Sequence, residues 1–146
     1  MPTEYFSDNS ETVFAAMPFD SVFEDVYHVA ICGAVRSVGF IPIRVDLLKH
    51  GQDSVSETYR QIKNCYAVIA DLSTAEPNVL LEVGYAHALG KPIVQLCNTV
   101  PEDLPFMVRN RDTIFYRTGQ THLLMGEISD YLRHLMGVPF EKSDRT

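Results

Sequence analysis

The sequence lacks a run of apolar residues long enough to cross a bilayer, for which about 18 consecutive residues are needed. Its first residues also lack the basic region and the apolar core of a secretory signal. We therefore expect neither membrane insertion nor secretion, and we predict a cytoplasmic location.

A basic surface is missing as well. The 19 Asp and Glu residues outnumber the 12 Lys and Arg residues, the formal net charge is −7, and the cations are dispersed along the chain. Binding to duplex nucleic acid draws on clustered cations. We therefore exclude a nucleic-acid polymer as a partner, although one or two cations could still meet a single phosphate.

Several motifs of enzyme chemistry are absent. No Walker loop and no G-x-G-x-x-G follows an apolar run, which argues against NTPases and dinucleotide dehydrogenases, and no G-x-S-x-G marks an ester hydrolase. Neither H-E-x-x-H nor C-x-x-C is present, so we predict no metal site and no bound cofactor. The three cysteines, Cys32, Cys65 and Cys97, lie in or beside apolar segments and are predicted to be buried, reduced thiols.

The remaining composition is that of one globular domain. A chain of 146 residues with 46% apolar residues is long enough to bury a core, and no repeat or linker divides it. We predict a single domain over residues 12–138, preceded by a flexible segment at 1–11 and followed by a tail at 139–146.

Short apolar runs alternate with stretches of helical periodicity along that domain. The predicted strands are Thr12–Ala16, Phe40–Val45, Tyr66–Leu72, Pro92–Cys97 and Thr113–Arg117. The predicted helices are Ser21–Ser37, Ser54–Asn64, Asn78–Leu89 and His122–Met136, the first capped by Asp20 or Ser21 and ended by Gly39. This alternation predicts a flavodoxin-like (Rossmann-like) three-layer α/β sandwich, with a parallel five-stranded sheet in the order 2-1-3-4-5.

A sheet of that order has a crevice where the direction of winding reverses, outside the carboxyl ends of strands one and three. The segments predicted to meet there are Met17–Asp20 and Asp71–Asn78, with the helix that bears Glu82 behind them. A small-molecule site is therefore expected at this edge of the sheet.

Glu82 is the main candidate for chemistry in the crevice. It lies one turn inside its helix and shares a face with Asn78 and Tyr85, while the apolar residues around it supply the packing surface. Nearness to the helix N-terminus favours the charged carboxylate, which suits a nucleophile or an electrostatic stabiliser. The alternative is a solvated glutamate that only complements the helix dipole.

The other crevice residues also have two interpretations. Asp71 could accept hydrogen bonds from a sugar hydroxyl, but Asp-Leu-Ser-Thr also indicates a side-chain-capped turn. Asp20 and Asn78 could contact a ligand or only cap helices, and Glu76 is a further carboxylate at the rim. Met17, Pro18 and Phe19 could form a wall against a flat base or simply close the top of the sheet.

The stretch CYAVIADLSTAEPNVLLEVGYAHALGKPIV, with FAAMPFDSVFEDVY upstream and RVD at 44–46, resembles the nucleoside 2-deoxyribosyltransferase-like, TIR-like predicted nucleotide-binding family. That family's pattern has a strand ending in Asp-Leu-Thr, a Pro-Asn-Val step and a helix reading Glu-x-Gly-Tyr-Ala-x-Ala-x-x-Lys-Pro. The matching letters are Asp71, Leu72, Ser73, Pro77, Asn78, Val79, Glu82, Gly84, Tyr85, Ala86, Ala88, Lys91 and Pro92.

The resemblance implies cleavage or exchange of an N-glycosidic bond in a nucleoside, nucleotide or NAD-like molecule. Glu82 would attack or stabilise the anomeric carbon, and Asp71 would hold ribose hydroxyls or protonate the base. Ser73 and Tyr85 then join the residues expected to contact the ligand. Water as acceptor gives hydrolysis, and a second base gives transfer. A neighbouring subunit often completes the pocket of deoxyribosyltransferases, so we expect a homodimer or a higher homo-oligomer.

The same residues are also consistent with a second function, which is not catalytic. Many relatives of this kind are nucleotide-binding or TIR-like modules, often linked with bacterial defence, so the crevice could serve a non-catalytic sensor or signalling module. A flavodoxin-like electron carrier or a phospho-receiver is less favoured, because MPFDS is a poor flavin loop and strand five ends in Arg117 rather than Lys.

Overall fold

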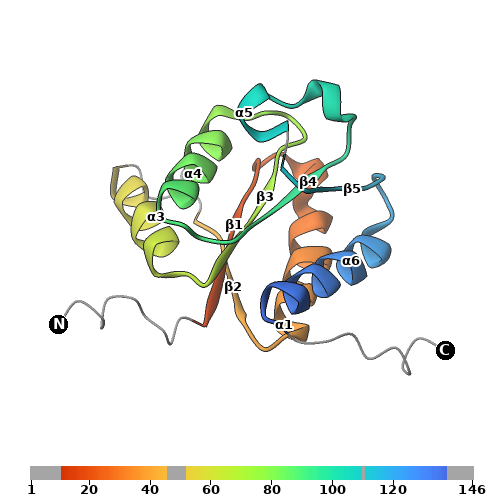
Figure 1. The fold of residues 1–146 in the computed structure, drawn as a ribbon, viewed down its shortest axis with the longest axis horizontal. Coiled ribbons are helices and arrows are strands. Elements are labelled where there is room, and N and C mark those ends of the chain that lie inside the picture. Colours follow the sequence, from red (N-terminus) through yellow and green to blue (C-terminus); the bar gives the residue numbers. More distant parts are fainter. Residues whose placement is uncertain (1–10, 46–51, 110, 138–146) are drawn as a thin grey trace.

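A computed structural model describes residues 11–45, 52–109 and 111–137. Its centre is a five-stranded, wholly parallel sheet in the order β2-β1-β3-β4-β5 (Figure 1). The strands are β1 (Thr12–Ala16), β2 (Ile41–Ile43), β3 (Ala67–Asp71), β4 (Ile93–Cys97) and β5 (Thr113–Phe115). The flavodoxin-like fold and the strand order predicted from the sequence are therefore confirmed.

Helices cover both faces of this sheet (Figure 1). One face carries η3 (Val26–Ile31), α1 (Cys32–Ser37) and α6 (Thr121–Leu135), and the other carries α3 (Gln52–Asn64), α4 (Pro77–Ala88) and α5 (Phe106–Arg109). Strand residues alternate between the two cores, since Val13 and Ala15 belong to the first and Phe14 and Ala16 to the second. A strand buried on both faces accounts for the continuous apolar run of β1.

The first predicted helix is helical but not uniformly α-helical. It begins as a short 3₁₀ turn, η2 (Ser21–Phe23), widens into the π-helical η3 and ends as α1. Within this helix Ile31 is fully buried in the core, whereas Val29 is only partly buried. Gly39, with φ of 90°, ends the helix as predicted.

The other elements differ from prediction mainly at their ends. The edge strands β2 and β5 are three residues long instead of six and five, because each has only one neighbour with which to pair. Two short helices, η4 (Pro101–Asp103) and α5, were not predicted, since they are too brief to show periodicity.

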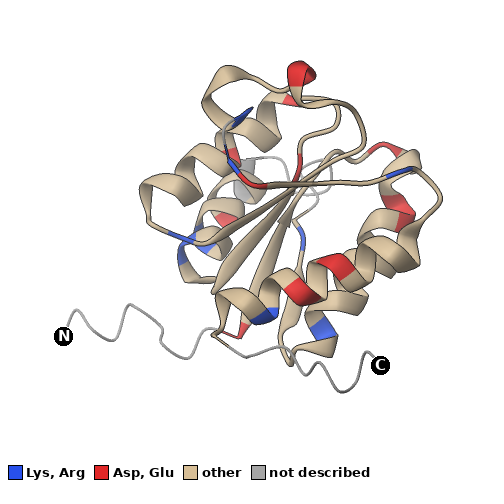
Figure 2. Cartoon of the chain, turned by 45° about the vertical axis from the view of Figure 1, so that its right-hand side comes forward, with Lys and Arg blue, Asp and Glu red and all other residues tan. Residues whose placement is uncertain are grey.

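The surface and the cysteines agree with the composition. Figure 2 shows Lys and Arg spread over several elements rather than gathered in one stripe. Cys32, Cys65 and Cys97 are buried and form no disulfide. Among the described residues, no helix combines the length and the apolar character that crossing a bilayer requires.

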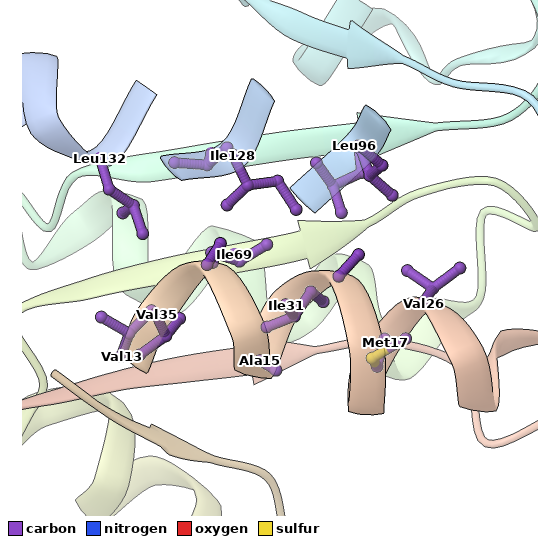
Figure 3. Close-up of a cluster of buried hydrophobic side chains, with 14 of the residues drawn as sticks. Val13, Ala15, Met17, Val26, Ile31, Val35, Ile69, Leu96, Ile128 and Leu132 are labelled. Atoms are coloured by element: carbon purple, nitrogen blue, oxygen red, sulfur yellow. The ribbon is translucent and has the colours of Figure 1, made fainter. Parts of the chain in front are cut away.

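The core on the α6 face holds that helix against the sheet. Figure 3 shows Ile128 and Leu132 of α6 meeting Ile31 and Val35 of the first helix over β1 and β3. Ile128→Ala should lower the free energy of unfolding by about 2–5 kcal/mol, because it leaves a cavity at a fully buried position. Urea denaturation measures the change.

Leu123→Ala on the same helix is the matched control. Leu123 is 61% exposed, so its removal should change the free energy of unfolding by less than about 0.5 kcal/mol. Equal losses from both variants would contradict the packing of α6 described here.

Candidate active site

A pocket of about 440 Å³ opens beyond the carboxyl ends of β1 and β3, where the winding of the sheet reverses. Its volume falls in the range of small-molecule sites, about 300–1,000 Å³. The lining comes from the loop after β1, the loop after β3 and the first turns of α4. These residues are Met17, Pro18, Phe19, Asp20, Thr74, Glu76, Asn78, Val79 and Glu82.

Six of the nine site residues predicted from the sequence therefore share one pocket: Met17, Pro18, Phe19, Asp20, Asn78 and Glu82. The other three, Asp71, Ser73 and Tyr85, are not part of its lining. Thr74 and Val79 were not predicted to contact a ligand. Thr74 lies in a segment expected at the crevice, but nothing in its residue type distinguished it from its neighbours.

Glu76 and a strained loop position the start of α4. Ala75 has φ of 50°, a conformation that is uncommon outside glycine, and its N–H donates to the Leu72 carbonyl at 3.0 Å. Glu76 is the N-cap, and its Oε1 accepts a hydrogen bond from the Asn78 N–H at 3.1 Å. The capping role considered for Asn78 is therefore wrong, since Glu76 caps α4. Asp20 does stand at the N-cap position of η2, but its side chain makes no capping bond.

Glu82 lines the pocket and is half-buried. Burial, and after it the nearby charge of Glu76, raises the pKa of the Glu82 carboxyl from 4.5 to about 7. The helix N-terminus was expected to favour the charged carboxylate, but burial acts in the opposite direction and raises the pKa. Helix dipoles stabilise a charge by about 0.3–1 kcal/mol at exposed sites, whereas one pKa unit corresponds to about 1.4 kcal/mol, so desolvation outweighs the dipole here.

Glu82→Gln should make the protein more stable at alkaline pH. Between pH 4.5 and about 7 the folded carboxyl retains a proton that the unfolded chain has released, so its contribution to stability falls as the pH rises. At pH 8 the variant should exceed the unsubstituted protein by about 2 kcal/mol in the free energy of unfolding. Near pH 4 the two should be equal within about 0.5 kcal/mol, as measured by urea denaturation.

Glu127→Gln provides the comparison, because Glu127 is an exposed residue of α6 on the other face of the sheet. It should show no such dependence on pH. A gain for Glu82→Gln that is the same at both pH values would mean that the Glu82 carboxyl is not desolvated.

Asp71 serves the loop rather than the pocket. It is fully buried; Oδ1 accepts from the Ser73 N–H at 2.9 Å, and Oδ2 accepts from the Tyr116 hydroxyl at 2.6 Å. The Ser73 hydroxyl in turn accepts from the Asn98 N–H at 2.8 Å. The side-chain-capped turn considered for Asp-Leu-Ser-Thr is therefore present, and it ties the ends of β3, β4 and β5 together.

Tyr116→Phe should lower the free energy of unfolding by about 1–3 kcal/mol, because it removes one of the bonds that compensate the burial of Asp71. Tyr59→Phe, at a partly exposed ring, should change it by less than about 0.5 kcal/mol. Chemical denaturation of both variants tests the difference, and an unchanged Tyr116→Phe protein would show that this hydrogen bond is dispensable.

Tyr85 turns away from the pocket. Its ring packs against Tyr59 of α3, with centroids 4.8 Å apart, and it lines a separate groove between α3 and α4. Position 85 lies within about 20° of position 78 around the helix axis, but it is seven residues further along α4. It is therefore about 10 Å beyond the end of the helix that meets the pocket, which accounts for the error. Glu82 and Asn78 also border a smaller cavity of about 170 Å³ on that side.

The described residues contain no group of three or more His, Cys, Asp and Glu placed to hold a metal ion. The fold and the pocket define an α/β protein with a carboxylate-lined pocket at the switch point of its sheet.

Within that class, the chain belongs to the nucleoside 2-deoxyribosyltransferase family, whose model matches residues 22–126. A search of curated proteins found no match. The matched span includes Glu82, Glu76 and Thr74 but begins after Met17–Asp20, so the place of that loop at the pocket rests on the sheet topology and the structure rather than on the family match.

Proposed function

We propose that the protein cleaves or transfers the N-glycosidic bond of a nucleoside, with Glu82 acting on the anomeric carbon. Family membership supports glycosyl transfer at nucleosides in general. The observation that carries the finer proposal is the half-buried Glu82 carboxyl, with its pKa raised to about 7, in a pocket that also has an apolar wall.

The chemistry follows from the charge that develops at the sugar. As the bond from C1′ to the base nitrogen breaks, C1′ becomes oxocarbenium-like, and the carboxylate either stabilises that charge or forms an ester with C1′. The departing base takes a proton from solvent water, and the water or second base that later attacks C1′ returns one proton to the solvent. Water or the nitrogen of a second base then attacks C1′, releasing Glu82 with the free sugar or a new nucleoside.

The charges around the pocket favour an uncharged substrate. Its lining contains three carboxylates, Asp20, Glu76 and Glu82, and none of the lining residues that the structure describes is Lys, Arg or His. Phosphate groups usually bind to cations or to the free N–H groups of a helix N-terminus. The N-terminus of α4 does reach this pocket, but the carboxylate of Glu76 caps it and accepts from the Asn78 N–H. We therefore favour a nucleoside over the nucleotide or NAD-like molecule that the sequence also allowed.

We propose that Glu76, rather than Asp71, is the second carboxylate of the site. Asp71 is occupied by Ser73 and Tyr116, whereas Glu76 lines the pocket and acts electrostatically on Glu82. We assign to Glu76 the role of tuning Glu82, and to Asp71 that of fixing the loop. Self-association and a cytoplasmic location stay predictions.

The test is release of free base from a panel of nucleosides and their 5′-phosphates, with and without a second base. The unsubstituted protein should act on a nucleoside, and Glu82→Gln should reduce kcat/KM on the order of 10³-fold or more while retaining binding. Because a nucleophile must be ionised, kcat/KM should rise with pH, reach half of its maximum near pH 7 and level off above that.

Glu127→Gln, far from the pocket, should retain full activity. Binding without release by the unsubstituted protein would favour the non-catalytic sensor or TIR-like module instead. Preference for the 5′-phosphates would contradict the charge argument, and kcat/KM falling as pH rises through 7 would assign Glu82 as an acid rather than a nucleophile.

A further inference from the structure

Arg44 contacts the ring of Phe19, which lines the pocket. It follows β2, whose Ile43 packs toward the core of the α3 and α4 face, so strand alternation turns Arg44 toward the first helix. There its guanidinium carbon lies 4.1 Å from the centroid of the Tyr27 ring and 5.1 Å from that of the Phe19 ring. Arg44 is not itself part of the pocket lining.

The surroundings of Arg44 fix its position. Its side chain is only 16% exposed, and its Nη1 lies 3.5 Å from Glu24 Oε2. The other oxygen of Glu24 lies 3.1 Å from His28 Nε2, so the carboxylate is held from two sides. A partly desolvated guanidinium between two rings is held by cation–π attraction as well as by charge.

Phe19 needs such support. It follows Pro18 in the loop between β1 and η2, outside regular structure, and 36% of its surface is exposed. Side chains on loops hold a binding geometry only when neighbouring groups lock them. Arg44 packs against the ring, and Phe19 also lines the pocket.

We propose that Arg44 is a positioning residue, which holds the Phe19 ring as the stacking surface for the base of the bound nucleoside. This inference rests on the proposed function, because it takes the ligand to carry a base. Arg44 acts through Phe19 and contacts no reacting atom. Its removal therefore weakens binding of the base and leaves interactions with the sugar unchanged.

Calorimetry on the Glu82→Gln protein tests this without interference from turnover. The ligands are adenosine, guanosine, cytidine, uridine and thymidine, then the free base of the tightest binder, and ribose. Arg44→Met and Phe19→Leu should each weaken binding of the nucleoside and the free base about tenfold, in line with the cost of losing one stacking contact. Affinity for ribose should not change.

Two further variants distinguish positioning from general damage to the fold. The double variant should bind no more weakly than either single variant, since both remove one interaction. Arg44→Lys, which keeps a cation over the rings, should recover part of the affinity, and it replaces Arg44→Met if that variant does not fold. Arg60→Met, at a 60% exposed arginine of α3 paired with Glu57, should bind as the parent does.

Additive losses in the double variant, or weaker binding of ribose, would overturn the proposal. So would a failure of all five nucleosides to bind. If nucleosides bind but the unsubstituted protein never releases a base, the proposed catalysis fails while the role of Arg44 is still decided by the same binding data.

Discussion

The parallel pairing of β1 with β3 is the constraint on which the rest of the structure depends. Val13 to Ala16 lie beside Ala67 to Ala70, although fifty residues separate the two strands along the chain. β2 occupies the other edge of β1, so the winding reverses between β1 and β3. Both strands end at the same edge, which brings the Met17–Asp20 loop against the loop that leads into α4.

Desolvation then decides the chemistry of the pocket. Glu82 projects from the second turn of α4 into a space already bounded by apolar side chains and by Glu76, so its charged form loses water without gaining a cation. Such a carboxyl destabilises the folded chain at alkaline pH. Functional sites commonly contain residues of this kind, which lower the stability of the folded state.

Some charged residues at this edge of the sheet support the pocket without lining it. Asp71, buried and bonded to Ser73 and Tyr116, joins the ends of three strands and so steadies the loop on which Thr74 and Glu76 stand. Arg44, which follows β2 on the other side of β1, likewise packs against a pocket residue, Phe19. The pocket is thus shaped by residues that do not line it.

Local patterns in the sequence determined the sheet order, both layers of helices and the edge at which the pocket opens. The alternation of apolar runs with helical periodicity, and helix-ending residues such as Gly39, depend only on neighbours along the chain, so the sequence alone reveals them. Only the tertiary structure decided that Asp71 faces Tyr116, that Tyr85 faces Tyr59, and that Glu82 has a raised pKa. Each of these depends on side chains brought together from distant segments, whose packing and loss of water no local pattern records.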